Sequence, residues 1–216
     1  WDDDIDICMP RPDYEKFISL WPMVNQIYEL KSDRLNNWDA PFTKIIDPTT
    51  QIESVYDESK GSLWIDVFPV DGLPSDRKAV ENIYKQCSFY RKLFMIAHAR
   101  LGEGKSQFHK YGKYILKPIV RLIGTKYFSG KIEEIARQIP YESAKYVGIV
   151  TWGLYGVGER MLKSEFEKEV EVEFEGYKMP AFSCWDSYLH GIYGNYMQLP
   201  PLEKRQTHDM IVYKKE

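Results

Sequence analysis

The chain has 216 residues, which is enough for one domain with a sizeable core and too few for two full domains. It is rich in aromatic side chains, with 16 Tyr, 10 Phe and 6 Trp, and its net charge of -3 excludes a globally basic nucleic-acid binder. Three cysteines without CxxC spacing encode neither a disulfide framework nor a zinc site, and no stretch reaches the roughly 18 apolar residues of a membrane-spanning helix.

The first seven residues, WDDDIDI, place four aspartates among large apolar side chains. If this segment is a strand, alternate residues point to the same face. One face then carries three carboxylates, those of Asp2, Asp4 and Asp6. The opposite face carries Trp1, Asp3, Ile5 and Ile7. Because that face is apolar apart from Asp3, we expect it to anchor the strand from behind.

The next elements follow from apolar periodicity and from turn residues. Residues 9–12 end the first strand, and Asp13 is expected to cap a helix that ends at Pro22. Residues 41–57 are typical of a hairpin or of two short strands around a turn that Asp47 forms.

A second strand with a carboxylate follows at residues 62–74, SLWIDVFPVDGLP, in which Asp66 lies among large apolar residues. Ser75 and Asp76 then start a long amphipathic helix that ends near Gly102. The acid of this second strand is therefore a candidate partner for the acids of the first.

The second half of the chain begins with a basic amphipathic segment, residues 105–131, which holds seven Lys or Arg and no Asp or Glu. The elements expected after it are an acidic helix at 132–138, a strand at 145–152, a glycine-rich loop at 153–160, a hairpin at 169–182 and a helix at 185–193.

Three interpretations compete for the acidic strand: a solvated edge, a calcium loop, and a centre for metal-dependent transfer of a phosphorus-containing group. The calcium loop is excluded because Ile7 and Asp13 stand where it needs Gly and Glu. Two carboxylates at i and i+2 on one strand lie about 7 Å apart at the backbone, which suits one Mg²⁺ or Mn²⁺ with phosphate oxygens. In that interpretation Asp4 and Asp6 are ligands and Asp66 is a third carboxylate.

Five segments, in this order, closely resemble the LicD family of bacterial phosphocholine transferases: WDDDIDI, TKIIDPTT, WIDVFPVDGLP, VEFEGYKMP and YLHGIYGNYMQLPP. Fukutin and fukutin-related protein, which are related to that family, share the acidic strand. The resemblance spans nearly the whole chain. It implies one nucleotidyltransferase-like α+β domain over residues 1–216, with a small mixed sheet flanked by helices, a helical insertion and a helical C-terminal part.

The resemblance also implies an activity. A CDP-linked alcohol, typically CDP-choline, donates phosphocholine to a hydroxyl of a cell-surface glycan such as teichoic acid or lipopolysaccharide, and CMP is released. Carried over, Asp4 and Asp6 are catalytic metal ligands and Asp66 is the third acid, with Mg²⁺ or Mn²⁺ as cofactor. Because family members carry a glycine-rich stretch and an arginine upstream of the acidic strand, we expect part of the phosphate site to precede Trp1.

Other residues are candidates for binding the donor. Lys44 and Arg11 can bind phosphate, with a plain surface charge as the alternative for each. A quaternary ammonium has no hydrogen to donate and is usually held by aromatic faces beside an acid. The candidates are Trp152, Tyr155, Trp185, Tyr188, Tyr193 and Tyr196, with Glu159 or Glu175 as the acid, and core packing is the alternative for each aromatic residue. His190 and His208 are candidate bases, each more often structural.

The basic segment at 105–131 is expected to face an anionic membrane or a phosphate-rich acceptor polymer through Lys113, Lys117 and Arg121, or to be a solvated helix face. The expected location is the cytoplasm, with peripheral contact at the inner face of the cell membrane, and no nucleic acid is expected as a partner. Two rival functions use the same residues: a metal-dependent glycosyltransferase with a DxD motif, and an inactive glycan-binding scaffold.

Overall fold

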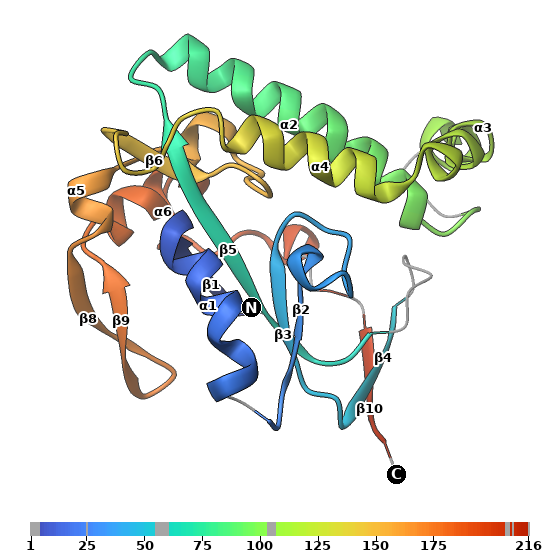
Figure 1. Ribbon diagram of the computed structural model, residues 1–216, viewed down its shortest axis with the longest axis horizontal. Coiled ribbons are helices and arrows are strands. Elements are labelled where there is room, and N and C mark those ends of the chain that lie inside the picture. The colour runs from blue at the N-terminus through green and yellow to red at the C-terminus, as the bar shows by residue number, and fades with distance from the viewer. Residues whose placement is uncertain are drawn as a thin grey trace.

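A computed structural model describes residues 5–24, 26–54, 61–102, 107–205, 208 and 210–215 of the protein. Helices pack on both faces of a central sheet, so the architecture is mixed α+β, as predicted (Figure 1). The nucleotidyltransferase-like topology stays a prediction. Among the residues described, no helix combines the length and the apolar content needed to cross a membrane.

The central sheet has six strands arranged around one long strand. They are β1 (Asp6–Pro10), β2 (Glu29–Lys31), β3 (Thr43–Ile46), β5 (Trp64–Leu73), β6 (Tyr146–Ile149) and β7 (Met161–Leu162). Strand β1 pairs in parallel with one edge of β5, and β3 and β6 pair antiparallel along its other edge. Two small antiparallel sheets join β4 (Thr50–Ser54) to β10 (Met210–Lys214) and β8 (Glu169–Phe174) to β9 (Tyr177–Phe182).

The helices divide between the two faces of the sheet. They are α1 (Arg11–Val24), α2 (Arg77–His98), α3 (Gln107–Ile123), α4 (Thr125–Ala136), α5 (Lys163–Phe166) and α6 (Trp185–Tyr193), with short 3₁₀ turns η1 (Asp33–Leu35), η2 (Gly156–Glu159) and η3 (Leu202–Lys204). Helix α1 lies on one face, while α2 and α4 pack side by side as a second layer with α3 at one end (Figure 1).

The core is split by the sheet into clusters on opposite faces. Beneath α1, one cluster joins Tyr14, Ile18, Leu30 and Val67. On the other face, a larger cluster includes Phe42, Phe68, Phe94, Val120 and Phe128. Since both faces of β5 are covered, eight consecutive residues of this strand, 66–73, are buried. The strand that carries Asp66 is therefore the rigid centre of the fold.

Several predicted elements are confirmed. Helix α2 starts after Asp76, whose carboxylate accepts a hydrogen bond from the Ala79 N–H at 2.9 Å. The hairpin β8–β9 turns through Glu175 and Gly176, which have φ values of 51° and 79°, as a two-residue turn of this hand requires. The final helix, α6, has the predicted bounds of 185–193.

The start and end of the first helix were predicted wrongly. Helix α1 begins at Arg11 instead of being capped by Asp13, because Pro12 is tolerated in a first turn, where its missing N–H has no acceptor. The helix also continues through Pro22 and ends only two residues later. A proline this close to the C-terminus costs one hydrogen bond and little more.

Residues 41–57 were expected to form either a hairpin or two short strands, and the structure shows two short strands. Segment 41–57 yields the two short strands β3 and β4 but no hairpin, because β4 pairs with the C-terminal strand β10, which the sequence analysis did not predict. Asp47 forms the turn as expected, since its carboxylate accepts hydrogen bonds from the Thr49 N–H and hydroxyl at 2.9 and 2.7 Å. The acidic helix expected at 132–138 is the second half of α4.

Candidate functional site

A row of four charged residues crosses the central sheet. Asp66, in β5, has Asp6 of β1 as its partner on one side and Lys44 of β3 on the other. Lys44 in turn has Lys31 of β2 as its partner. Because register partners point to the same face of a sheet, the four side chains form a line with two lysines at one end and two aspartates at the other.

The row occupies the face of the sheet that α2 covers. Cys8 lies one pleat further along β1 on this face and packs against the larger cluster. Ile7 points to the opposite face and packs in the cluster beneath α1, so its predicted anchoring role is confirmed. Ile5 is 46% exposed and does not anchor the strand by its side chain. Residues 1–4, and with them the predicted ligand Asp4, lie outside the described residues.

Asp66 is a buried carboxylate with two polar contacts on different oxygens. Its Oδ1 lies 3.3 Å from the Lys44 Nζ, and its Oδ2 accepts a hydrogen bond from the Trp64 indole N–H at 3.0 Å. Burial raises the pKa of Asp66 above its ordinary value, against the opposing effects of Lys44 and Trp64. A carboxylate in such a place is stabilised by additional positive charge.

Lys44 lies in an aromatic box beside this carboxylate. Its Nζ is 4.0 Å from the centre of the Trp64 ring, 5.6 Å from that of Phe42 and 5.8 Å from that of Trp38. The ring of His208 packs edge-on against Trp64, with ring centres 5.3 Å apart. The structure therefore brings together three predicted site residues on neighbouring strands, Asp6, Asp66 and Lys44, and adds His208 at their edge.

The described part of the site fits a hard divalent cation bound jointly with phosphate. Asp6 and Asp66 supply carboxylate oxygens from adjacent strands, which are about 4.8 Å apart in a sheet. No group of three or more His, Cys, Asp or Glu that could hold a metal occurs within the described ranges. Two carboxylates are nevertheless an ordinary protein contribution to a Mg²⁺ site, in which water and substrate phosphates complete the shell.

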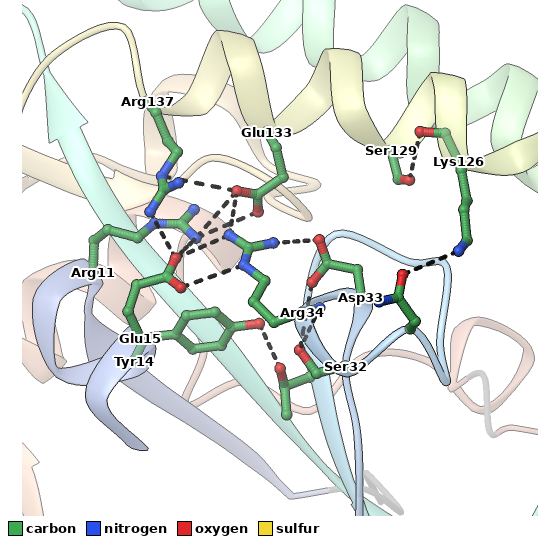
Figure 2. A network of polar contacts seen from close by, with 12 residues as sticks. Arg11, Tyr14, Glu15, Ser32, Asp33, Arg34, Lys126, Ser129, Glu133 and Arg137 are labelled. Atoms are coloured by element: carbon green, nitrogen blue, oxygen red, sulfur yellow. Dashed lines mark hydrogen bonds and ion pairs between the residues drawn. The ribbon is translucent and has the colours of Figure 1, made fainter. Parts of the chain in front are cut away.

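Arg11, the other predicted phosphate ligand, lies in a different place. It follows Asp6 by five residues, and it donates from Nε and Nη2 to both oxygens of Asp71 at 2.7 Å. Its Nη1 lies 3.3 Å from both oxygens of Glu133 and 3.4 Å from Glu15. These contacts belong to a buried ion-pair network that joins α1, η1 and α4 (Figure 2) and reaches β5 through Asp71. The structure does not bring Arg11 to the row.

Burial and ion pairing act in opposite directions on the pKa values of Arg11 and Asp71. Burial lowers the pKa of Arg11, but Asp71 and Glu133 outweigh it and raise the value. Burial raises the pKa of Asp71 despite the effect of Arg11. Bidentate contacts at 2.7 Å are those of a carboxylate with a guanidinium, so we treat the pair as ionised.

Three of the residues predicted to bind choline are used inside the protein: Trp152, Tyr188 and Glu159. Trp152 packs against Phe42 and Phe94, with ring centres 4.9 and 6.0 Å apart, and the Arg91 guanidinium lies 5.8 Å from its ring. Glu159 is 2% exposed. Its oxygens accept hydrogen bonds from three groups, the N–H groups of Leu154 and Tyr155 and the Tyr188 hydroxyl.

The other aromatic candidates lie at the surface in two groups. Tyr155 and Tyr193 pack edge-to-face at 5.1 Å. The ring centres of Trp185 and Tyr196 are 6.5 Å apart, and the Tyr196 hydroxyl donates a hydrogen bond to the Asp186 carboxylate at 2.5 Å. Asp186 was not among the predicted acids, although its place next to Trp185 in the sequence could have indicated it. Glu175 lies in the hairpin turn between β8 and β9.

Helix α6 and the glycine-rich loop are held against each other close to the row. Their backbones meet at Gly158 and Gly191, where an added Cβ on Gly158 would lie 2.3 Å from the Gly191 carbonyl oxygen. Cys8 connects this region to the row: burial, then Asp6, then Glu159 raise the pKa of its thiol to about 12. Cys8 and Tyr188 of α6 both pack against the larger core cluster.

Two residues of the basic segment do not lie as predicted. The Lys117 Nζ donates to the carbonyl of Ala99 at 2.7 Å, and the Arg121 Nε donates to that of Ala97 at 3.1 Å. Both groups therefore stabilise the C-terminal end of α2. The most exposed side chains of α3 are apolar or aromatic, with Leu122 89% and Ile115 72% exposed.

The fold and the row thus define an α+β protein with a charged centre on one face of its sheet, acidic at one end and basic at the other. The chain is 27% identical over 213 residues to the lipopolysaccharide cholinephosphotransferase LicD of Haemophilus influenzae, and the match covers 96% of this chain and 78% of that protein. No protein-family model and no solved structure matches the chain. The similarity extends over nearly the whole chain, and it supports the resemblance to the LicD family.

Proposed function

We propose that the protein transfers phosphocholine from a CDP-linked donor to a hydroxyl of a lipopolysaccharide-type glycan, with release of CMP. The relationship to a lipopolysaccharide cholinephosphotransferase supports the group transferred and the kind of acceptor. The observation that supports a CDP-linked donor and a metal ion is the order of charges in the row: Lys31, Lys44, Asp66 and Asp6. Its acidic end suits a cation, and its basic end suits the diphosphate that the cation accompanies.

Asp6 and Asp66 would hold Mg²⁺ or Mn²⁺, together with the predicted ligand Asp4. The cation would neutralise the diphosphate as negative charge develops on the departing CMP. Once Asp66 has a cation beside it, Lys44 can exchange its ion pair for a phosphate oxygen without leaving its aromatic box. In the reaction, the acceptor oxygen forms a bond to the β-phosphorus while the bond from that phosphorus to the CMP oxygen breaks, and the proton of the acceptor hydroxyl passes to solvent.

The headgroup would be held by surface aromatic residues of the C-terminal region. Trp185 and Tyr196 would offer ring faces, and Asp186, which accepts a hydrogen bond from the Tyr196 hydroxyl, would offer a counter-charge to a quaternary ammonium. Trp152 and Glu159 do not belong to the proposed choline site, because both are engaged in contacts inside the protein.

The test is CMP release from CDP-choline by the full chain with Mg²⁺ and a lipopolysaccharide acceptor. We expect release that a chelator abolishes and that Asp6→Asn and Asp66→Asn each reduce severely. Asp13→Asn, which changes an exposed carboxylate on α1, is the matched control and should keep full activity. A protein that releases nucleotide from nucleotide sugars and none from CDP-choline would instead be a glycosyltransferase, and the proposal would fail.

A further inference from the structure

Helix α3 presents an apolar face to solvent. Six of its apolar or aromatic residues are each more than half exposed: Tyr111, Tyr114, Ile115, Ile119, Leu122 and Ile123. The spacing of Tyr111, Ile115, Ile119 and Leu122 puts them on one side of the helix. Leu122 is 89% exposed and Ile115 is 72% exposed, so this face has no cover from the described residues.

The opposite side of α3 fixes the helix to the protein. Val120 is buried in the larger core cluster, and Lys117 is 3% exposed and bonds to the end of α2. Arg121 bonds to the same end of α2. The helix therefore cannot turn its apolar side inward without breaking these contacts. Figure 1 shows α3 at one end of the helical layer, where its outer side faces away from the sheet.

An exposed apolar face of this kind marks an interaction surface, and the charge around it selects the partner. In the described part of this segment, residues 107–131, Arg121 and Lys126 are exposed and Lys113 is partly exposed, and no Asp or Glu occurs. A symmetric contact with a second copy of the chain would place one such acid-free surface against another, so their positive charges would repel. A lipid membrane with anionic headgroups is apolar inside and negatively charged at its surface. It therefore complements both the apolar face of α3 and the positive charge around it.

We propose that α3 docks the protein on an anionic lipid surface. The helix would lie in the plane of the interface with its exposed apolar residues among the acyl chains. The tyrosines Tyr111 and Tyr114 would lie at headgroup level, where amphipathic rings are favoured. This surface contains none of the residues of the row, so docking and transfer are separate properties.

Binding of the full chain to vesicles tests the proposal. The vesicles are one part phosphatidylglycerol to two parts phosphatidylcholine, compared with phosphatidylcholine alone, and the readout is co-sedimentation. We expect binding to the anionic vesicles that added salt weakens, and a loss of about tenfold or more in the double variant Ile115→Glu/Leu122→Glu. Both residues are exposed, so the fold should persist, which circular dichroism checks.

The matched control is Met23→Glu, which puts the same charge on an exposed apolar residue of α1, 82% exposed, and should bind like the unchanged protein. Equal binding of the double variant and the unchanged protein, or no binding to anionic vesicles, would overturn the proposal. So would a dimer in analytical ultracentrifugation that the double variant abolishes, because a second copy would then cover α3. CMP release on a water-soluble acceptor should be unaffected, which separates this test from that of the transfer.

Discussion

The protein contains two clusters of charged residues on its central sheet, and they are arranged differently. In the network around Arg11, each ion pair joins opposite charges. Arg11, Arg34 and Arg137 contact Glu15, Asp33 and Glu133 (Figure 2), and Arg11 also contacts Asp71. In the row, the two lysines are neighbours and the two aspartates are neighbours. Opposite charges that alternate satisfy one another, whereas like charges side by side on a sheet are destabilising unless something of opposite charge binds between them.

The two clusters also differ in the kind of cation. The network uses arginines, whose planar guanidinium fixes two bonds at once, as Arg11 does with Asp71. The row uses lysines, and Lys44 holds Asp66 through a single contact at 3.3 Å. A point charge on a flexible stem can change partners. We infer that the network holds α1 to the sheet and that the row is adapted to a ligand.

The largest effect should come from the row. Asp66→Asn removes a charge that the proposed cation needs, and we expect CMP release to fall about 10³-fold or more. The free energy of unfolding should change by less than about 1 kcal/mol, because asparagine keeps an acceptor for the Trp64 N–H and relieves a buried charge. Kinetic assays together with urea unfolding check both parts. A loss of activity that merely followed a loss of folded protein would contradict the distinction between the clusters.

The network should show the opposite behaviour. Asp71→Leu leaves the buried Arg11 without its bidentate partner, and we expect a loss of about 3–5 kcal/mol in the free energy of unfolding. The double variant Arg11→Met/Asp71→Leu should recover most of that loss, since it buries no unpaired charge. Urea unfolding of the two variants measures the difference. If the double variant were folded and stable yet inactive, Arg11 would belong to the site after all.

The contrast also shows what the sequence could predict. Alternation in WDDDIDI assigned Asp6 and Ile7 to opposite faces, because parity within one strand is a local property. The row itself depends on register between strands far apart in the sequence, such as Asp6 with Asp66, and local patterns do not encode register across such distances. Lys31 was missed for this reason, since its three-residue strand gives no periodic signal.

The errors at Arg11 and α3 have a related cause. A cation next to an acidic strand is a reasonable phosphate ligand, and only the parallel pairing of β1 with β5 brings Arg11 to Asp71. In α3 the sequence shows two faces but not which one faces inward. Lys117 turns inward, and the exposed Arg121 reaches across, because the last carbonyls of α2 need donors, and this need is visible only when the two helices are placed together.

A smaller effect is expected from the lysine end of the row. Lys44→Met keeps the length of the side chain and its packing on Trp64 but removes the charge, and we expect the KM for CDP-choline to rise about tenfold or more. The kcat should change less, because the substitution removes a binding contact and leaves both aspartates in place. Lys16→Met, on the exposed side of α1, is the control. An unchanged KM would leave the basic end of the row without a role in binding the donor.

The smallest effect is expected for Glu15, at the partly exposed rim of the network around Arg11. Its contribution to the free energy of unfolding should depend on pH. Partial burial raises the pKa of Glu15, but hydrogen bonds from Arg34 and the charges of Arg34 and Arg137 outweigh it and hold the value below the ordinary 4.5. A folded-state pKa below the unfolded one means that the stabilisation is present above about pH 4.5 and is lost as the pH falls through the folded value.

Glu15→Gln should therefore cost less than about 1 kcal/mol at neutral pH, since the side chain is partly exposed and solvent screens the pairs. The cost should shrink as the pH approaches the pKa of Glu15 in the folded protein, where the unchanged protein loses the same charge. Urea unfolding of both proteins at neutral pH and at low pH measures this difference. A cost that stays constant with pH would mean that Glu15 acts by packing, and the network would then depend on the buried Arg11 and Asp71 pair instead of on its exposed rim.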